Sequence, residues 1–257
     1  MRRSNFGEAN LLIHIFTKDF GKVEAVGKSA RKAKGKLKGH LEPFLYADFN
    51  LVHGKKMDTV AGSFVLEPFL GLRSSFEKVL AASVIAEIAD RMTVENYRDE
   101  RVFELLCRSF AFLDREPLSD KLMWLLILFF EVNLLSLSGF APQADRCVFC
   151  LEKMPPGKNF FSFSLGGVLD SLCAGRIPDA VAVDDDVIKL LRFLTVSDEK
   201  GDYGDNVTAK LCELAKVNVK SEALYRAAIL MKNFIEFNID RKINSFETYL
   251  NFARERI

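Results

Sequence analysis

The sequence has few cysteines and no long apolar run, and each shortage excludes a class of protein. Five cysteines in 257 residues, an odd number thinly spread, do not form the disulfide framework of a small secreted protein. The most apolar run, Leu122–Phe130, ends at Glu131 and falls well short of the roughly 20 residues that span a bilayer. No secretory signal is recognisable, because the apolar stretch 11–16 contains His14 and is followed by charged residues. We therefore expect a soluble protein of the cytoplasm, with no membrane partner.

Signatures of the common enzyme classes are also missing. The sequence has no G-x-S-x-G nucleophile elbow, no H-E-x-x-H zinc motif and no glycine-rich dinucleotide loop. The segment from Gly21 to Ser29 resembles a phosphate-binding P-loop, but five residues separate its glycines where the motif has four. The three histidines (14, 40 and 53) lie far along the chain from the paired cysteines considered below. We therefore expect a protein that is not an enzyme.

What is present is a globular composition with an uneven distribution of charge. Hydrophobic residues make up 49% of the chain and 23 residues are phenylalanine, which excludes disordered, collagenous and coiled-coil classes. The formal net charge is only +1, but residues 1–60 hold 12 Lys and Arg against six Asp and Glu. The remaining residues hold 24 basic and 29 acidic side chains. A basic first part joined to a mildly acidic body predicts a polyanionic partner for the first part only.

The first 68 residues are predicted to form a small β-barrel or sandwich. Short apolar runs at 11–16 and 23–26 flank a hairpin-like turn at 18–21. Segment 44–52 alternates with a period of two, so it is typical of a half-buried strand, and a further strand is expected at 57–66. Short strands at this spacing favour a barrel such as the OB-fold.

Beyond residue 72 the hydrophobic pattern changes to that of helices. Apolar stripes with a spacing of three and four predict helices over 76–92, 100–113 and 221–239. Segment 119–138 is apolar nearly all round, which predicts the central helix of a bundle, begun by Ser119 or Asp120 and ended by Gly139.

An insert with three of the five cysteines interrupts the helical pattern at 140–180, where we expect irregular structure. A helix should follow Asp184, and 197–206 is expected to be a polar loop. The predicted fold is therefore α+β: a β-domain over 1–68, then an all-helical domain over 69–257 that contains the insert.

A basic run follows the second predicted strand. Six cations with no acidic residue among them are interleaved mainly with small residues, so they have no partner within the segment and repel one another. A loop of this kind on a barrel wall is suited to binding phosphates, through the release of counterions. A solvated loop is the alternative. The candidate DNA-binding residues are Lys28, Arg31, Lys32, Lys34, Lys36 and Lys38, with Lys56 in a later turn.

Phe44 and Tyr46 fall on the strand face opposite the apolar set that contains Leu45 and Phe49. In a nucleic-acid-binding barrel such aromatic side chains stack on bases. The preferred alternative is that they pack under the basic loop or against the helical body.

The insert contains a C-x2-C knuckle, Cys147 and Cys150, of the kind that holds zinc. After 19 residues comes Asp170-Ser171-Leu172-Cys173, which has the spacing of a second pair with an aspartate in place of one cysteine. Three thiolates and a carboxylate form a harder and less usual zinc ligand set than four thiolates. The alternative is that no zinc binds and that packing of Phe149, Phe161 and Phe163 holds the knuckle.

Short segments along nearly the whole chain form an ordered set. Those of the first part are residues 6–10, 15–18, 21–22, 28–32, 41–44 and 57–59. Those of the second part are the turn 139–142, the knuckle 145–150, residues 163–169, and the last helix with Lys242 and Ser245. In their order and spacing these segments resemble the RecO family of bacterial recombination mediators.

The resemblance implies an N-terminal OB-fold, a helical body and a zinc-knuckle region. It further implies a protein that binds single- and double-stranded DNA at the nucleoid, anneals complementary strands and displaces single-strand-binding protein (SSB) by way of its C-terminal tail. With RecR, such a protein promotes the loading of RecA at gaps. Two other classes stay open: a DNA- or RNA-processing or -binding protein with the same barrel, and an interaction scaffold that binds no DNA.

The sequence departs from the family pattern in two places. Family members have a further strand before the element that corresponds to 2–8, so either the start of the sequence is misassigned or the barrel lacks its first strand, which would leave an open edge. Asp170 replaces the fourth cysteine, which affects the coordination of zinc. Some family members lack the cysteines altogether, so the resemblance implies a mediator function that does not depend on the metal.

Overall fold

The computed structural model describes residues 2–32, 37, 39–115, 117–196, 203–214 and 216–254. The chain divides into two compact units. The first unit comprises residues 1–117 and 251–257, and the second comprises residues 118–250.

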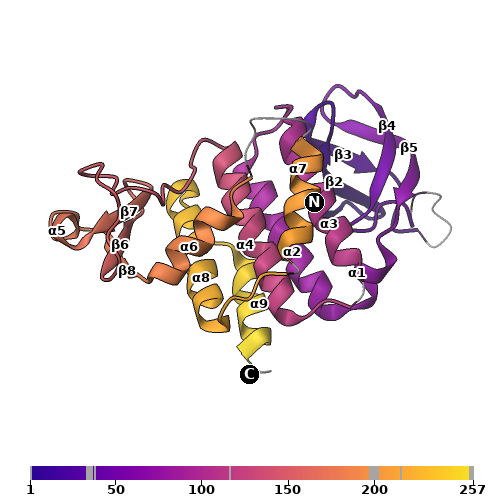
Figure 1. The fold of residues 1–257 in the computed structure, drawn as a ribbon. Helices are drawn as coiled ribbons and strands as arrows, with labels where there is room; N and C mark the ends of the chain where they lie inside the picture. Colours follow the sequence, from indigo (N-terminus) through magenta and orange to yellow (C-terminus); the bar gives the residue numbers. More distant parts are fainter. Residues whose placement is uncertain are drawn as a thin grey trace. The chain divides into compact units, whose positions relative to one another are not determined.

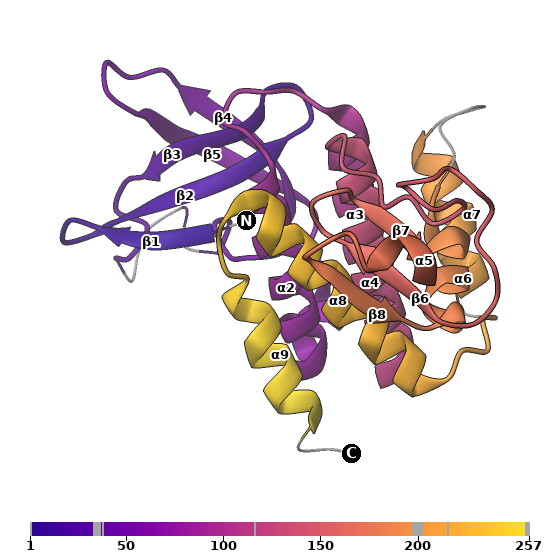
Figure 2. The ribbon, with the colours of Figure 1, turned by 90° about the vertical axis from the view of Figure 1, so that its left-hand side faces the viewer.

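A five-stranded sheet with the strand order β1-β2-β3-β5-β4 forms the N-terminal part of the first unit (Figures 1 and 2). All neighbouring strands are antiparallel except β3 and β5, which run parallel. This order and direction are those of an OB-fold, a partly open five-stranded barrel. The strands are β1 (Arg2–Phe6), β2 (Asn10–Thr17), β3 (Gly21–Gly27), β4 (Tyr46–Val52) and β5 (Asp58–Glu67).

Segment 2–6, part of the 2–8 element, itself forms the first of five strands, so the sheet does not have the missing strand that was expected from the sequence. Arg2–Phe6 pairs with β2 from Arg2 opposite His14 to Phe6 opposite Asn10. All five residues of this strand are exposed. Within the described residues no ladder joins β1 to β4, so these two strands are the edges of the sheet.

The β2–β3 hairpin depends on a glycine. Gly21 has φ +67°, a left-handed conformation that is strained for residues with a side chain. A Cβ atom at this position would also clash with the Tyr97 carbonyl group. The turn therefore requires glycine for its backbone shape and for the close approach of the 97–98 segment.

The inner face of the sheet carries a small apolar core. Phe49 and Leu51 of β4 pack against it, while Asp48 and Asn50 are exposed, which confirms the predicted alternation. The core residues are Ile13, Ala25, Ala30, Leu41 and Val60.

A β-bulge in β5 reverses the alternation halfway along the strand. Leu51 pairs with Val60 and the preceding residue, Asn50, pairs with Gly62. Ala61 of β5 therefore has no partner on β4. Val60 is buried, and without the bulge Phe64 would lie on the same face. Instead the Phe64 side chain is 68% exposed.

Three helices follow the sheet in the first unit: α1 (Leu70–Ser74), α2 (Phe76–Met92) and α3 (Glu100–Asp114). The second and third correspond closely to the predicted ranges. The Ser75 side chain accepts a hydrogen bond from the amide of Lys78, and Asp99 accepts from the amides of Arg101 and Val102. These caps satisfy amides that the first turn of a helix leaves unpaired.

The second unit is built around α4 (Asp120–Leu137), in which every residue from Met123 to Leu135 is buried. This confirms the predicted central helix. Ser119 caps its start by accepting from the Leu122 amide, and Gly139 follows its end with φ +84°. In the described part of the chain, no helix is long and apolar enough to cross a membrane. The other long helices are α6 (Asp185–Leu194), α7 (Tyr203–Leu214), α8 (Ser221–Ile239) and α9 (Asn244–Arg254), whose last residues belong to the first unit.

Two parts of the second unit differ from the sequence prediction. The insert is not irregular: it contains a sheet of order β7-β6-β8 and a one-turn helix, at one end of the helices of this unit (Figure 1). Helix α7 begins at Tyr203, within the segment expected to be a loop. The insert elements are β6 (Asn159–Ser162), β7 (Gly167–Asp170), α5 (Ser171–Ala174) and β8 (Ala180–Val183).

Candidate nucleic-acid interface and metal centre

The basic segment after β3 is anchored at its base by the β1–β2 turn. Asn10 Oδ1 accepts a hydrogen bond of 2.9 Å from the Ser29 amide, and the Ala9 carbonyl accepts one of 3.0 Å from the Arg31 amide. Ser29 has φ 56°, a left-handed conformation that turns the chain sharply after β3. Ala30 lies in the core of the sheet. The backbone at the base of the segment is therefore fixed at several points.

This anchoring presents the first cations of the segment to solvent. Lys28, Arg31 and Lys32 are all exposed. Lys28 and Lys32 make no ion pair with any described residue, whereas the Arg31 guanidinium donates to the Glu8 carbonyl at 3.2 Å. Lys34, Lys36 and Lys38 lie outside the described residues.

Lys56 is exposed in the turn between β4 and β5, beside Lys55. No hydrogen bond or ion pair among the described residues connects it to the 28–32 segment. Its assignment to the same interface therefore stays a prediction.

Phe44 and Tyr46 pack against helix α3, not against solvent. The Phe44 ring meets Phe110 edge to face at 5.6 Å, and the Tyr46 ring meets Phe103 at 5.8 Å. Both residues line a cleft of about 660 Å³ in the first unit. The preferred interpretation, packing against the helical body, is confirmed for both rings.

Phe64 is an exposed aromatic side chain of the sheet that was not predicted from the sequence, and Phe6 on β1 is exposed as well. Phe64 lies on β5 opposite the exposed Asp48. Its position depends on the bulge near Gly62, and an interior glycine in a strand was the only signal of that bulge.

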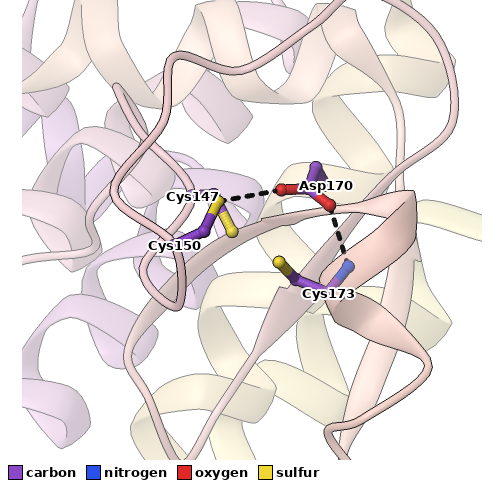
Figure 3. Close-up of side chains that lie close together, drawn as sticks. All are labelled: Cys147, Cys150, Asp170 and Cys173. Atoms are coloured by element: carbon purple, nitrogen blue, oxygen red, sulfur yellow. Dashed lines mark hydrogen bonds between the residues drawn. The ribbon is translucent and has the colours of Figure 1, made fainter.

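In the second unit, Cys147, Cys150, Asp170 and Cys173 come together as the spacing predicts. Their ligand atoms all lie within 4.8 Å of one another (Figure 3). A tight turn brings the first two cysteines side by side, since the Leu151 amide donates to the Cys147 carbonyl at 2.8 Å. Asp170 is the N-cap of α5, and Cys173 lies within its single turn.

Asp170 uses its two carboxylate oxygens differently. Oδ1 accepts hydrogen bonds from the amides of Leu172 and Cys173, at 2.9 and 2.8 Å, and so caps α5. Oδ2 faces the sulfur of Cys150 at 3.2 Å (Figure 3). Hydrogen bonds from the Cys173 amide and the neighbouring thiols hold the pKa of Asp170 well below its usual value. The carboxylate is therefore ionised and fixed in orientation.

The thiols of the cluster differ in their surroundings. Burial raises the pKa of Cys173 to about 12. Burial also opposes the ionisation of Cys147, but backbone donors, beginning with the amide of Cys150, outweigh it and lower the pKa of that thiol. Cys150 itself is exposed.

The four side chains fit a tetrahedral metal ion such as zinc. With zinc–sulfur bonds of about 2.3 Å, neighbouring ligand atoms in a tetrahedron lie about 3.8 Å apart, so the present spacing needs only a small contraction. The backbone amides on Oδ1 would act as the outer hydrogen bonds that orient a metal-binding carboxylate.

Phe149, Phe161 and Phe163 do not pack together around the knuckle, as the alternative without zinc predicts. Phe149 is 46% exposed, with the Arg176 guanidinium 5.9 Å from its ring centre. Phe161 and Phe163 instead contact Phe234 of α8. The buried core beside the cluster comprises Cys147, Leu169, Cys173 and Ala174.

The two sites and their scaffolds define a mixed α+β protein with an OB-type sheet, a helical body and a knuckle-bearing insert. Residues 1–69 match the family described as Recombination protein O N terminal, and residues 73–245 match Recombination protein O C terminal. The chain belongs to the RecO family.

Curated proteins similar to this chain bear the name DNA repair protein RecO. The protein from Dehalococcoides mccartyi strain 195 is 32% identical over 198 residues, which cover 77% of this chain and 76% of the relative. The protein from Acetivibrio thermocellus is 29% identical over 248 residues, 95% and 94% of the two chains. The protein from Roseiflexus sp. strain RS-1 is 33% identical over 194 residues, 76% and 67% of the two chains.

Proposed function

We propose that this chain is a DNA-binding recombination mediator and not an enzyme. The observation that carries the proposal is the anchored basic segment of the OB-type sheet, in which Lys28 and Lys32 are exposed without an acidic partner among the described residues. Unpaired cations held on a fixed backbone attract phosphates, and each contact releases a condensed counterion.

In this proposal the protein binds single strands first and then brings complementary strands together. The cations at 28, 31, 32, 34, 36, 38 and 56 neutralise backbone phosphates, which lowers the repulsion between two strands and so speeds annealing. Phe64 adds an exposed ring on which a base stacks. Neither contact reads a base sequence, as suits a protein that acts at any gap.

The proposed partners follow from the family. The relatives are named as DNA repair proteins, and membership supports displacement of SSB through its tail and cooperation with RecR in loading RecA. We further propose that Cys147, Cys150, Asp170 and Cys173 hold zinc. Zinc in that site would cross-link the Cys147–Cys150 knuckle to β7 and α5.

The experiment is fluorescence anisotropy of a labelled single-stranded oligonucleotide, titrated with the protein at several salt concentrations. Two variants change overlapping parts of the basic segment, residues 28–32 and residues 32–36: Lys28→Glu/Arg31→Glu/Lys32→Glu and Lys32→Glu/Lys34→Glu/Lys36→Glu. Each should weaken binding uniformly across sequences and flatten the salt dependence, by a slope of about 0.9 per lost phosphate contact on duplex DNA and about 0.7 on single strands.

A matched control reverses three exposed lysines of the second unit, Lys189→Glu/Lys216→Glu/Lys220→Glu, with the same change in net charge. It should leave affinity and slope close to those of the wild type. If the wild type shows no salt-dependent affinity, the scaffold interpretation replaces the mediator. Turnover of a nucleotide or nucleic acid would instead establish a processing enzyme.

A further inference from the structure

A second group of potential metal ligands lies in the first unit, apart from the cysteines. His14 on β2, Glu24 on β3 and Glu95 in the segment after α2 have ligand atoms that lie within 4.8 Å of one another. The His14 side chain is only 8% exposed, and that of Glu24 is 32% exposed. Nothing in the DNA-binding proposal uses these residues.

The backbone fixes all three residues. His14 and Glu24 are directly opposite each other in the β2–β3 ladder, so their side chains lie on the same face of the sheet. Glu95 is brought to this face by a parallel bridge to Lys22, in which the Asn96 amide donates to the Lys22 carbonyl at 2.9 Å. The cluster therefore does not depend on the conformation of a single loop.

The contact between Arg2 and His14 shows which form of the imidazole faces the cluster. An Arg2 guanidinium nitrogen lies 3.1 Å from His14 Nε2. Because a guanidinium has only donors, Nε2 accepts this hydrogen bond and carries a lone pair. Glu24 Oε2 lies 3.5 Å from the same nitrogen. Two electron-pair donors thus face each other beside a cation, as they do around a bound metal ion.

The charges around the cluster leave a surplus of negative charge. The Lys22 ammonium lies 2.7 Å from the Asp90 carbonyl and 3.5 Å from the Asp90 carboxylate, so its charge is directed to Asp90. Glu95 makes no hydrogen bond or ion pair with any residue that the structure describes. The side chains of Arg2, Lys22, Glu24, Asp90 and Glu95 together have two positive and three negative charges.

We propose that His14, Glu24 and Glu95 form a binding site for a divalent transition-metal cation. One imidazole and two carboxylates are a ligand set that suits zinc, manganese or cobalt, with water in the remaining positions. The cation displaces the Arg2 guanidinium from Nε2. It links β2, β3 and the segment between α2 and α3, and it does so independently of the cysteine cluster.

The probe is Mn²⁺, whose free ion gives an electron paramagnetic resonance signal that is lost on binding. Manganese favours carboxylate ligands over thiolates, so it reports on this site and not on the cysteines. We expect one bound Mn²⁺ per chain. Glu24→Gln and Glu95→Gln should each weaken the affinity by at least about tenfold, while Arg2→Ala should strengthen it, because the competing cation is removed.

Two controls keep the result specific. Glu67→Gln changes an exposed acid at the end of β5, and Asp170→Asn alters the cysteine cluster; both should bind Mn²⁺ as the wild type does. Circular dichroism checks that each variant is folded. Arg2→Ala removes no metal ligand, so tighter Mn²⁺ binding by this variant cannot result from misfolding. The proposal is overturned if neither the wild type nor Arg2→Ala binds Mn²⁺ at millimolar concentration. It is equally overturned if both Glu→Gln variants bind as the wild type does.

Discussion

The Asp170 carboxylate faces the Cys150 thiol, with Oδ2 3.2 Å from Sγ, while its other oxygen caps helix α5. An aspartate in this position therefore does something that a cysteine would not, because a thiol is a weak hydrogen-bond acceptor for the two amides. The exchange of a thiolate for a carboxylate leaves the number of potential ligands at four.

Replacement of Asp170 by asparagine or alanine separates these two roles. Asparagine is a good N-cap but has no charge, so Asp170→Asn should keep the local structure and weaken zinc binding by about 10- to 100-fold. Asp170→Ala should lose the zinc affinity and also about 1 kcal/mol of stability. Competition with a chromogenic chelator measures the first effect and urea unfolding the second. Equal zinc affinity in Asp170→Asn and the wild type would show that the carboxylate is not a ligand.

The anchor of the basic segment is testable without a change of charge. Asn10→Ala removes the acceptor of the Ser29 amide, at a cost of about 1 kcal/mol if the amide is left unpaired. If the anchored backbone positions the cations, DNA affinity should fall several-fold while net charge stays the same. Anisotropy titrations measure this, with Asn50→Ala on the exposed face of β4 as the control. Identical affinities in both variants would mean that the anchor does not contribute to binding.

Phe64 should contribute to binding of single strands but not of duplexes. Removal of a stacking ring in Phe64→Ala should cost about 1–3 kcal/mol with single-stranded DNA, a roughly 5- to 150-fold loss, at an unchanged salt slope. Bases in a duplex are already stacked, so duplex affinity should stay close to that of the wild type. Leu172→Ala, an exposed apolar position in the insert, is the control. Loss of affinity for both forms of DNA would point to a change in the sheet and not to stacking.

The buried Glu131 of α4 should make stability depend on pH. Neither carboxylate oxygen has a hydrogen-bond partner among the described residues, and burial raises the pKa of this group well above 4.5. The folded state therefore holds a proton that the unfolded state releases. The contribution of Glu131 to stability is greatest at pH values below its pKa in the unfolded chain. It falls by about 1.4 kcal/mol per pH unit as the pH rises from that value toward the pKa of Glu131 in the folded protein.

Glu131→Met replaces the carboxyl with an apolar side chain of similar length. The variant should lose this slope and be more stable than the wild type at pH 8, with a smaller difference at pH 5. Urea unfolding at several pH values measures both. An unchanged slope in Glu131→Met would assign the pH dependence to other groups.

Most long elements could be predicted from hydrophobic period alone. Helices α2, α3, α4 and α8 match the expected ranges closely, because each has at least 15 residues over which the period is repeated. The strands of the insert have four residues each, too few for a period to be distinguished from chance. Phe64 could not be assigned to the exposed face, because the bulge near Gly62 inverts the positions that follow it, from Gly62 to Val65.

The sites were predictable to different degrees. The spacing of Cys147, Cys150, Asp170 and Cys173 was sufficient to bring them together, because both pairs sit on short turns whose local geometry is fixed. The cluster of His14, Glu24 and Glu95 was not predictable from spacing. Two of its members meet through strand register, and the third comes from a segment after α2 that bridges to β3.

The contacts of Phe161 and Phe163 with Phe234 mean that the insert has a second attachment besides its potential metal. Loss of the ion would therefore release the knuckle loop while β6 stays fixed to α8. Chelation should expose the loop around residue 150 to proteases long before the helices unfold.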